Sequence, residues 1–251
     1  MGKSAVAVEI ALQAGLEGGR VCFASLEMSA DDLVMRMAAQ RTGAMGRGVN
    51  FCDYESGHLT QAQYETVAHA AQEIHDLPIE FLPENYRDVG ALYAGAKQCA
   101  ARMGGLDLVV VDYLQLLRAP GKGRYDQITE ISISLKALAM QLKVPVLALT
   151  QLSRACEQRD DKRPMLSDLR ESGQLEQDAD AAIFCYREAY YLERDRPGDD
   201  DPVEAHEDWR AAMERHRTRL ELIVAKQRQG RIGTAHLNYN PALNVFWGGA
   251  S

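Results

Sequence analysis

The stretch at residues 106–112, LDLVVVD, decides the fold class of this 251-residue chain. Its leucines and valines form a near-continuous apolar run, which is typical of a strand that is covered on both faces. A second run of this kind, VPVLALT, occupies residues 144–150, and a helical pattern at about residues 126–142 lies between the two. The order strand, helix, strand predicts a parallel unit of an α/β sheet.

The same alternation continues on both sides of this unit. Ser29, with Asp32 three residues later, resembles a capping box and marks the start of one helix. The other expected helices cover residues 3–15, 60–76 and 88–103, and the other expected strands cover 20–26, 78–82, 180–186 and 220–226, the last resuming the sheet. Residues 234–240 and 244–247 predict a C-terminal β-hairpin with its turn at Pro241. We therefore expect one α/β domain over residues 1–251, with a mostly parallel sheet flanked by helices.

One segment departs from this alternation. Residues 193–217 are Pro-rich and carry nine Asp or Glu residues between Glu193 and Glu214. Residues 211–219, AAMERHRTR, could form a short helix at the end of this segment. We expect an acidic surface insertion between two strands.

The composition is that of an ordinary globular protein, with 46% hydrophobic and 25% charged residues. It excludes a wholly disordered, collagen-like or coiled-coil chain. The net charge of −8 excludes a basic coat for nucleic acid, although a local basic strip can still follow phosphates. The five cysteines include no C-x-x-C pair, which argues against a metal site. Glu9 interrupts the apolar run that a secretion signal would need. No segment reaches the ~20 apolar residues that span a bilayer. We expect a cytoplasmic protein with reduced cysteines and no membrane association.

The first residues, Met1-Gly2-Lys3-Ser4, stand directly before a predicted helix. Gly-Lys-Ser at a helix start is the second half of a phosphate-binding loop, in which backbone N–H groups hold phosphates, lysine reaches the β- and γ-phosphates, and serine holds Mg²⁺. The motif lacks its first glycine and preceding strand here, and composition alone produces it in roughly a tenth of chains this long. A chance match stays open on this motif alone.

Three polar residues follow predicted strands. Asp112 stands where nucleotide-binding folds hold the Mg²⁺ shell, or it is a solvated carboxylate at a strand end. Glu27 could orient or deprotonate a water, or it only complements a helix dipole. Gln151 could sense a γ-phosphate, or it is a plain loop residue. Because ligands bind at the carboxyl ends of strands in open α/β sheets, the conjunction of these residues with Lys3 favours a nucleotide site.

Five stretches of the chain together resemble one family: MGKS, SLEMS, VVDYLQL, QLSRACEQRDDKRPMLSDLRESGQLEQDAD and AKQRQG. They are similar to the C-terminal motor domain of DnaB-type replicative DNA helicases, and DKRPMLSDLRESG is the most specific part. The resemblance covers nearly the whole chain. It implies a RecA-like P-loop NTPase core, ATP and Mg²⁺ as cofactors, and a homohexameric ring that moves 5′ to 3′ along single-stranded DNA during replication. It also implies primase and a helicase loader as partners.

The resemblance assigns roles in the nucleotide site. Gly2, Lys3 and Ser4 would bind the phosphates, and Ser4 and Asp112 would hold Mg²⁺ through the nucleotide. Glu27 would be the catalytic base.

Further roles concern coupling between sites and subunits. The resemblance implies that Gln151 couples the γ-phosphate to the DNA loops, and that Lys226 and Arg228 reach the neighbouring subunit's nucleotide. Arg228 would be the arginine finger, which needs a fixed fork of donors and a permanent charge and is worth ~10³–10⁵ in rate in NTPases. The alternative is a pair of surface basic residues beside a strand.

The resemblance places DNA contact in the loop DLRESG, at Arg170, Glu171 and Gly173. Arginine supplies charge, and glycine lets a backbone N–H group approach a phosphate. Such contacts do not read base sequence and weaken with salt, and the loop has no aromatic residue for base stacking. The alternative is a solvated charged loop. The acidic insertion is expected on the ring exterior, because acids in a DNA channel would repel phosphate.

The family pattern extends beyond these 251 residues. A glycine-containing stretch, a first strand, a linker helix and an N-terminal primase-docking domain precede Met-Gly-Lys in the family. We expect a fragment or a misassigned start, with weak nucleotide binding and poor ring formation for this chain alone. The alternatives to a helicase motor are a non-catalytic truncated remnant and a RecA-like recombinase or regulatory ATPase; DLRESG and SLEMS weigh against the recombinase.

Overall fold

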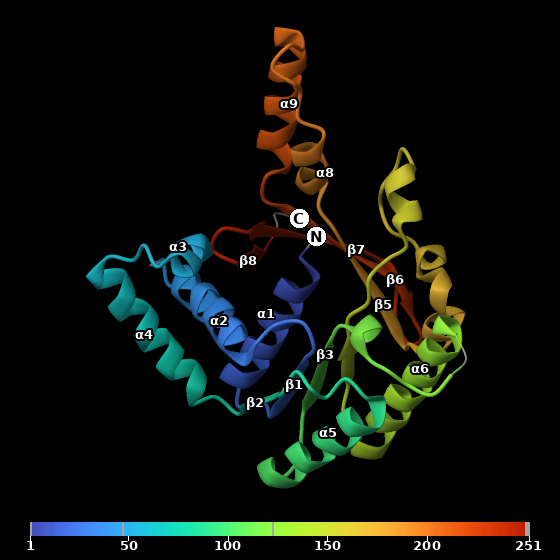
Figure 1. Ribbon diagram of the computed structural model, residues 1–251. Coiled ribbons are helices and arrows are strands. Elements are labelled where there is room, and N and C mark those ends of the chain that lie inside the picture. The colour runs from blue at the N-terminus through green and yellow to red at the C-terminus, as the bar shows by residue number, and fades with distance from the viewer. Residues whose placement is uncertain (1, 47, 122, 249–251) are drawn as a thin grey trace.

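Two four-stranded sheets form the frame of the computed structural model, which describes residues 2–46, 48–121 and 123–248 (Figure 1). The description leaves out the side chains of residues 51, 55, 154 and 170–172. The first sheet is parallel, with the order β2-β1-β3-β4. Its strands are β1 (Val21–Ser25), β2 (Ile79–Leu82), β3 (Leu108–Asp112) and β4 (Val146–Ala148). All five residues of β3 are buried, which confirms the interpretation of the apolar run at 106–112.

Helices cover both faces of the parallel sheet, as the sequence predicts. One face carries α1 (Lys3–Leu16), α2 (Ala30–Ala44) and α4 (Gln61–His75), and the other carries α5 (Val89–Met103) and α6 (Arg124–Leu142). Side chains alternate along β3, so that Leu108 and Val110 pack in the first layer while Val109 and Val111 pack in the second. Each fully buried aliphatic side chain contributes about 1.5–3 kcal/mol, and this core fixes the strand ends in space.

Side-chain caps determine where three of these helices begin. Ser29 and Asp32 form a reciprocal capping box at the start of α2, with Asp32 in place of the usual Glu or Gln. Thr60 and Gln63 form a second box before α4. The carboxylate of Asp88 accepts hydrogen bonds from the first backbone N–H groups of α5. Caps of this kind are worth ~1 kcal/mol each, and they occupy donors that a ligand at these helix starts would need.

The second sheet is antiparallel, with the order β5-β6-β7-β8. Its strands are β5 (Ala181–Tyr186), β6 (Arg219–Gln227), β7 (Gly233–Asn240) and β8 (Val245–Gly248). The C-terminal hairpin is confirmed, but the prediction that residues 180–186 and 220–226 continue the parallel sheet is wrong. The helical connection between them lets β6 return antiparallel beside β5 (Figure 1), and an apolar run carries no information on strand direction. Ala5 of α1, Leu220 and Tyr239 join this sheet to the first helix layer.

The acidic segment contains most of a two-helix arm, α8 (Glu188–Arg194) and α9 (Val203–His216). Figure 1 shows α9 standing away from both sheets beside α8. The Trp209 indole N–H donates to the Leu192 carbonyl oxygen at 2.7 Å, and the Arg196 guanidinium lies 5.7 Å from the centre of the Trp209 ring. The sequence indicates a short helix only at the end of this segment, whereas α9 already begins after Pro202. Ala, Glu, Met and Arg favour the longer helix.

Short elements complete the chain. Residues 153–172 contain two 3₁₀ helices, η2 (Arg154–Gln158) and η3 (Leu166–Ser172), and the second runs into α7 (Gly173–Asp178). η1 (Leu114–Leu116) follows β3, and α3 (Phe51–Ser56) is a helix that the periodicity does not predict. Within the described ranges, no helix has the length and apolar character needed to cross a membrane.

Candidate nucleotide-binding site

The first turn of α1 lies open to an anion. Gly2 precedes the helix with φ +94°, a left-handed conformation that glycine adopts without strain. It offers no side chain to cap the helix, and the first turn of α1 contains no acidic residue. The backbone N–H groups of this turn therefore keep the positive end of the helix dipole exposed, in contrast to the capped starts of α2, α4 and α5. This is the geometry that binds phosphate.

Lys3 points from this turn toward the end of β4. Its Nζ donates a hydrogen bond of 2.6 Å to the main-chain oxygen of Thr150. Burial lowers the pKa of Lys3, while the nearby groups of Asp112, Cys185 and Glu27 raise it in that order. The lysine thus lies within electrostatic reach of both candidate carboxylates.

Asp112 ends β3 beside the end of β1. Its main-chain oxygen accepts a hydrogen bond of 2.8 Å from the N–H of Leu26, and the residue is only 3% exposed. Burial raises the pKa of Asp112, whereas a hydrogen bond from the Ser4 hydroxyl and the charge of Lys3 lower it. Asp112 is thus a buried carboxylate at the start of α1, with the Ser4 hydroxyl as donor and the charge of Lys3 nearby.

Glu27 sits on a fixed turn after β1. The Ser25 hydroxyl donates to the Met28 carbonyl oxygen at 2.6 Å and accepts from the Met28 N–H at 3.1 Å, which closes the turn around Glu27. The Glu27 side chain is exposed, yet its charge acts on both Lys3 and Asp112. An exposed carboxylate on a rigid turn beside a phosphate site is placed to orient or deprotonate a water.

The structure therefore brings five of the sequence-predicted residues to one edge of the parallel sheet. They come from the start of α1 and the ends of β1, β3 and β4: Lys3, Ser4, Glu27, Asp112 and Gln151. Gln151 joins the group through its neighbour Thr150, and its own side chain is exposed.

Sequence reasoning missed two residues of this edge. Thr150 contributes a main-chain oxygen, for which residue type gives no signal. Gln115 bonds to Thr150 and Gln151, and its signal was a polar residue inside the apolar stretch VVVDYLQL.

Lys226 and Arg228 lie apart from this group, at the far end of β6. Leu220, near the start of β6, packs against α1, and six residues of strand place Lys226 about 20 Å further along. Lys226 Nζ donates to the carbonyl oxygens of Glu176 and Gln177, the second at 3.2 Å.

Arg228 contacts the same end of α7. It donates to the Gln177 carbonyl oxygen at 2.6 Å and pairs with the Asp180 carboxylate at 3.2 Å. Both basic residues therefore bind the C-terminal end of α7 in their own chain and lie outside the Lys3 group.

The loop expected to contact DNA runs through η3 into α7. The predicted contacts of Arg170 and Glu171 fall on side chains that lie outside the described residues. Gly173 begins α7 in open space, since a Cβ atom there would meet nothing within 4 Å. The base of the loop is fixed by Asp168, which is 4% exposed and accepts two hydrogen bonds from Arg159, at 2.9 and 2.7 Å.

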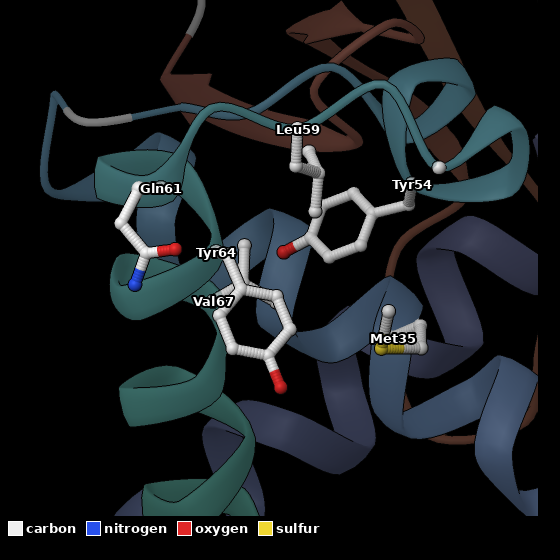
Figure 2. Close-up of a pocket in the computed structure, with 7 residues that line it drawn as sticks. Met35, Tyr54, Leu59, Gln61, Tyr64 and Val67 are labelled. Atoms are coloured by element: carbon white, nitrogen blue, oxygen red, sulfur yellow. The ribbon is translucent and has the colours of Figure 1, made fainter.

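A separate cavity of about 530 Å³ lies between α2, α3 and α4. Figure 2 shows its lining, which is largely apolar and includes Met35, Tyr54, Leu59, Tyr64 and Val67. It shares no residue with the Lys3 group. Among the described residues, no cluster of three or more His, Cys, Asp or Glu side chains is placed to hold a metal ion.

Comparison with known proteins matches the DnaB-like helicase C-terminal domain to residues 1–247. The chain belongs to the DnaB-like helicase C-terminal domain family. Replicative DNA helicase DnaB of Rickettsia bellii is 37% identical over 261 residues, which cover 98% of this chain and 51% of that protein. The chain thus spans about half the length of the curated DnaB relatives that it matches.

Two solved structures share the fold at 32% identity and a TM-score of 0.83. One is a DnaB-like replicative helicase, described together with its interactions with primase, and the match covers 100% of this chain and 55% of that one. The other is an ATPase domain, and the match covers 99% of this chain and 81% of that domain. The expected RecA-like core of the DnaB family is thereby confirmed, and membership in this family implies the use of a nucleotide.

Proposed function

We propose that the chain is an ATP-hydrolysing motor domain that moves along single-stranded DNA as part of a replicative helicase. The observation that carries this proposal is the convergence of Lys3, Ser4, Glu27 and Asp112 at the open start of α1. A lysine, a hydroxyl and two carboxylates at that place match the needs of phosphate binding and hydrolysis. The family match and the likeness to a solved ATPase domain support the same interpretation.

The donor set fits a magnesium ion that arrives with the nucleotide. Mg²⁺ prefers oxygen ligands and usually takes one or two from protein, with the rest from phosphates and water. Ser4 and Asp112, joined by a hydrogen bond, offer such oxygens at the start of α1. The bound ion would supply charge neutralisation for the phosphates.

Each residue then has a distinct task. Lys3 would exchange the Thr150 carbonyl for a phosphate oxygen, a stronger acceptor for an ammonium group. Glu27 would orient a water and take its proton. Gln151, on the segment after β4, would report the presence of the γ-phosphate to the loop that follows.

The DNA proposal rests on that following loop. Residues 153–172 connect Gln151 to α7, and the Arg159–Asp168 pair fixes their geometry. Arg170 and Gly173 would contact the phosphate backbone of single-stranded DNA, with Glu171 between them. Affinity would then fall steeply with salt and vary little with base sequence.

We further propose a homohexameric ring in which Arg228 and Lys226 reach the nucleotide of the adjacent subunit. Their distance from the Lys3 group of their own chain supports action in trans. Primase is a proposed partner because a similar helicase is described with primase, and a helicase loader and 5′-to-3′ movement are proposed from the family resemblance. From the proposed role on replicating DNA, we also propose a cytoplasmic location.

The direct test is steady-state ATP hydrolysis by the chain, with and without single-stranded DNA. We expect DNA to stimulate turnover and the Lys3→Ala variant to lose at least about 100-fold in rate, because a phosphate-binding ammonium is removed. Lys97→Ala is the matched control, since Lys97 is an exposed lysine on α5 beside Tyr93. Hydrolysis by the Lys3→Ala variant at the parent rate would contradict the proposed site.

A further inference from the structure

Gln115 clamps the main chain of Gln151. The Gln115 side-chain amide donates to the Gln151 carbonyl oxygen at 3.1 Å and accepts from the Gln151 N–H at 3.1 Å. The same Nε2 also donates to the Thr150 hydroxyl at 2.7 Å. One side chain thus satisfies both polar groups of the Gln151 backbone.

This clamp takes the place of a strand. The ladder between β3 and β4 ends with the pair Val111 and Ala148, and the chain beyond it carries Thr150 and Gln151 without a strand partner in that ladder. A primary amide presents one donor and one acceptor in the same way as a peptide group. The Gln115 side chain therefore continues the hydrogen bonding of the β3–β4 ladder to the main chain of Gln151. The side-chain amide of Gln151 itself faces solvent.

Gln115 itself is well anchored. It lies in η1, three residues after Asp112, and is half-buried. Its main-chain oxygen accepts a hydrogen bond of 2.7 Å from Arg124, and the N–H of Leu114 donates to the Leu149 carbonyl oxygen at 2.9 Å. The clamp therefore ties Gln151 to the segment that carries Asp112.

The clamp also reaches the lysine. Thr150 receives Gln115 on its hydroxyl and Lys3 on its main-chain oxygen, at 2.7 and 2.6 Å. Gln115 and Lys3 therefore hold Thr150 at two separate acceptor atoms, and Thr150 lies between η1 and the start of α1.

We propose that Gln115 is a positioning residue that fixes the backbone of Gln151, so that the Gln151 side chain distinguishes a nucleotide with a γ-phosphate from one without. This inference rests on the proposed function, and it adds a residue that acts only through Gln151. Loss of the clamp frees the Gln151 backbone while the start of α1, Ser4 and Asp112 stay in place. Binding of a diphosphate is then retained, and the preference for a triphosphate is lost.

The experiment compares the dissociation constants of ADP and of the β,γ-imido analogue of ATP, both measured by calorimetry with Mg²⁺. Gln115→Met removes the amide at nearly constant length, and Gln115→Glu keeps an acceptor for the Gln151 N–H but loses both N–H donors. Gln72→Met is the control, because Gln72 is an exposed glutamine on α4. The melting temperature of every variant checks that it folds.

We expect Gln115→Met to reduce the preference for the analogue over ADP by about tenfold, with ADP affinity within about threefold of the parent. Gln115→Glu should have an intermediate effect, and Gln72→Met should have none. Gln151→Ala should show the same loss as Gln115→Met, and the double variant should lose no more than Gln151→Ala, because both changes remove one function.

Three results would overturn the inference: an unchanged preference in Gln115→Met, losses that multiply in the double variant, and a parent chain that binds both nucleotides equally. The Lys3→Ala variant separates this inference from the proposed function. If Lys3→Ala binds both nucleotides like the parent, the nucleotide site itself is wrong. If Lys3→Ala loses both while Gln115→Met keeps its preference, only the role of Gln115 is wrong.

Discussion

The ammonium group of Lys3 donates a hydrogen bond of 2.6 Å to the main-chain oxygen of Thr150, a residue 147 positions further along the chain. This contact joins the start of α1 to the end of β4. If Lys3 gives up the Thr150 oxygen for a phosphate oxygen, as proposed, the segment that carries Gln151 changes a contact when the site fills. The proposed nucleotide site and the loop after β4 thus share the ammonium group of Lys3.

Gly2 is expected to matter through its backbone conformation. At φ +94° an alanine is strained by about 1–2 kcal/mol, so Gly2→Ala should distort the first turn of α1 and weaken nucleotide binding at least about tenfold. Gly18→Ala is the matched control, because Gly18 has φ +83° and open space around it but lies beyond the other end of α1. Calorimetric titration of ATP should show the loss only for Gly2→Ala. Equal losses in both variants would show that the effect is one of global stability.

The buried charge of Asp112 should lower the stability of the domain, although the proposed nucleotide site needs it. Because burial raises the pKa of this carboxyl, its ionised form lowers the free energy of unfolding at neutral pH, and Asp112→Asn should raise the melting temperature there. A rise of about 2–4 °C corresponds to ~1 kcal/mol in a domain of this size. Protonation of the folded parent removes the penalty as the pH falls toward the ordinary value of 3.8.

The measurement for Asp112 is a series of thermal melts from about pH 7.5 to about pH 4.5. The advantage of Asp112→Asn should be largest at the neutral end and shrink steadily toward the acidic end, while ATP hydrolysis is lost throughout. A variant that is less stable than the parent at neutral pH would show that the Lys3 and Ser4 contacts outweigh the cost of burying the charge.

Arg159 is expected to hold the base of the DNA loop. Arg159→Ala removes two charge-assisted hydrogen bonds to the buried Asp168 and should lower the melting temperature of the domain. It should also weaken binding of single-stranded DNA, measured by fluorescence anisotropy at fixed salt, while ATP affinity stays unchanged. Arg210→Ala on the exposed side of α9 is the control for lost positive charge. DNA affinity that falls equally in both variants would assign the effect to net charge.

The parallel sheet could be predicted from the sequence because its physical cause is local. A strand that is covered on both faces is mostly apolar, and the apolar runs at 106–112 and 144–150 indicate such strands. The caps at Ser29 and Thr60 are equally local, although the sequence pattern predicts only the first. The separation of β5 and β6 into an antiparallel sheet was not predictable, because strand direction depends on the path of the connection between them.

Some residues of the candidate site could likewise be predicted from the sequence, and others could not. Lys3, Glu27, Asp112 and Gln151 could be selected because parallel strands bring their carboxyl ends to one edge. The contacts of Gln115 could not be selected, because they depend on where η1 turns after β3. The positions of Lys226 and Arg228 against α7 likewise follow from tertiary packing and not from the motif AKQRQG.

Action of Arg228 in trans predicts complementation between inactive variants. Lys3→Ala disables the site of its own subunit, and Arg228→Ala disables the site of its neighbour, so an equal mixture contains interfaces with both residues intact. With random assembly, about a quarter of the interfaces should hydrolyse ATP, and the mixture should recover activity that neither variant has alone. The control mixture contains Arg231→Ala in place of Arg228→Ala. Arg231 is an exposed arginine in the turn after β6. If Arg228 acts in cis, the mixture gains no activity.

The most direct test of the central claim uses Glu27→Gln. Because Glu27 is exposed and the exchange keeps its size, the variant should fold and bind ATP as the parent does, within about threefold. Single-turnover hydrolysis with radiolabelled ATP should then fall at least about 100-fold, while Glu204→Gln on the outer arm hydrolyses at the parent rate. A Glu27→Gln variant that binds and hydrolyses ATP like the parent would contradict the assignment of this sheet edge as a catalytic site.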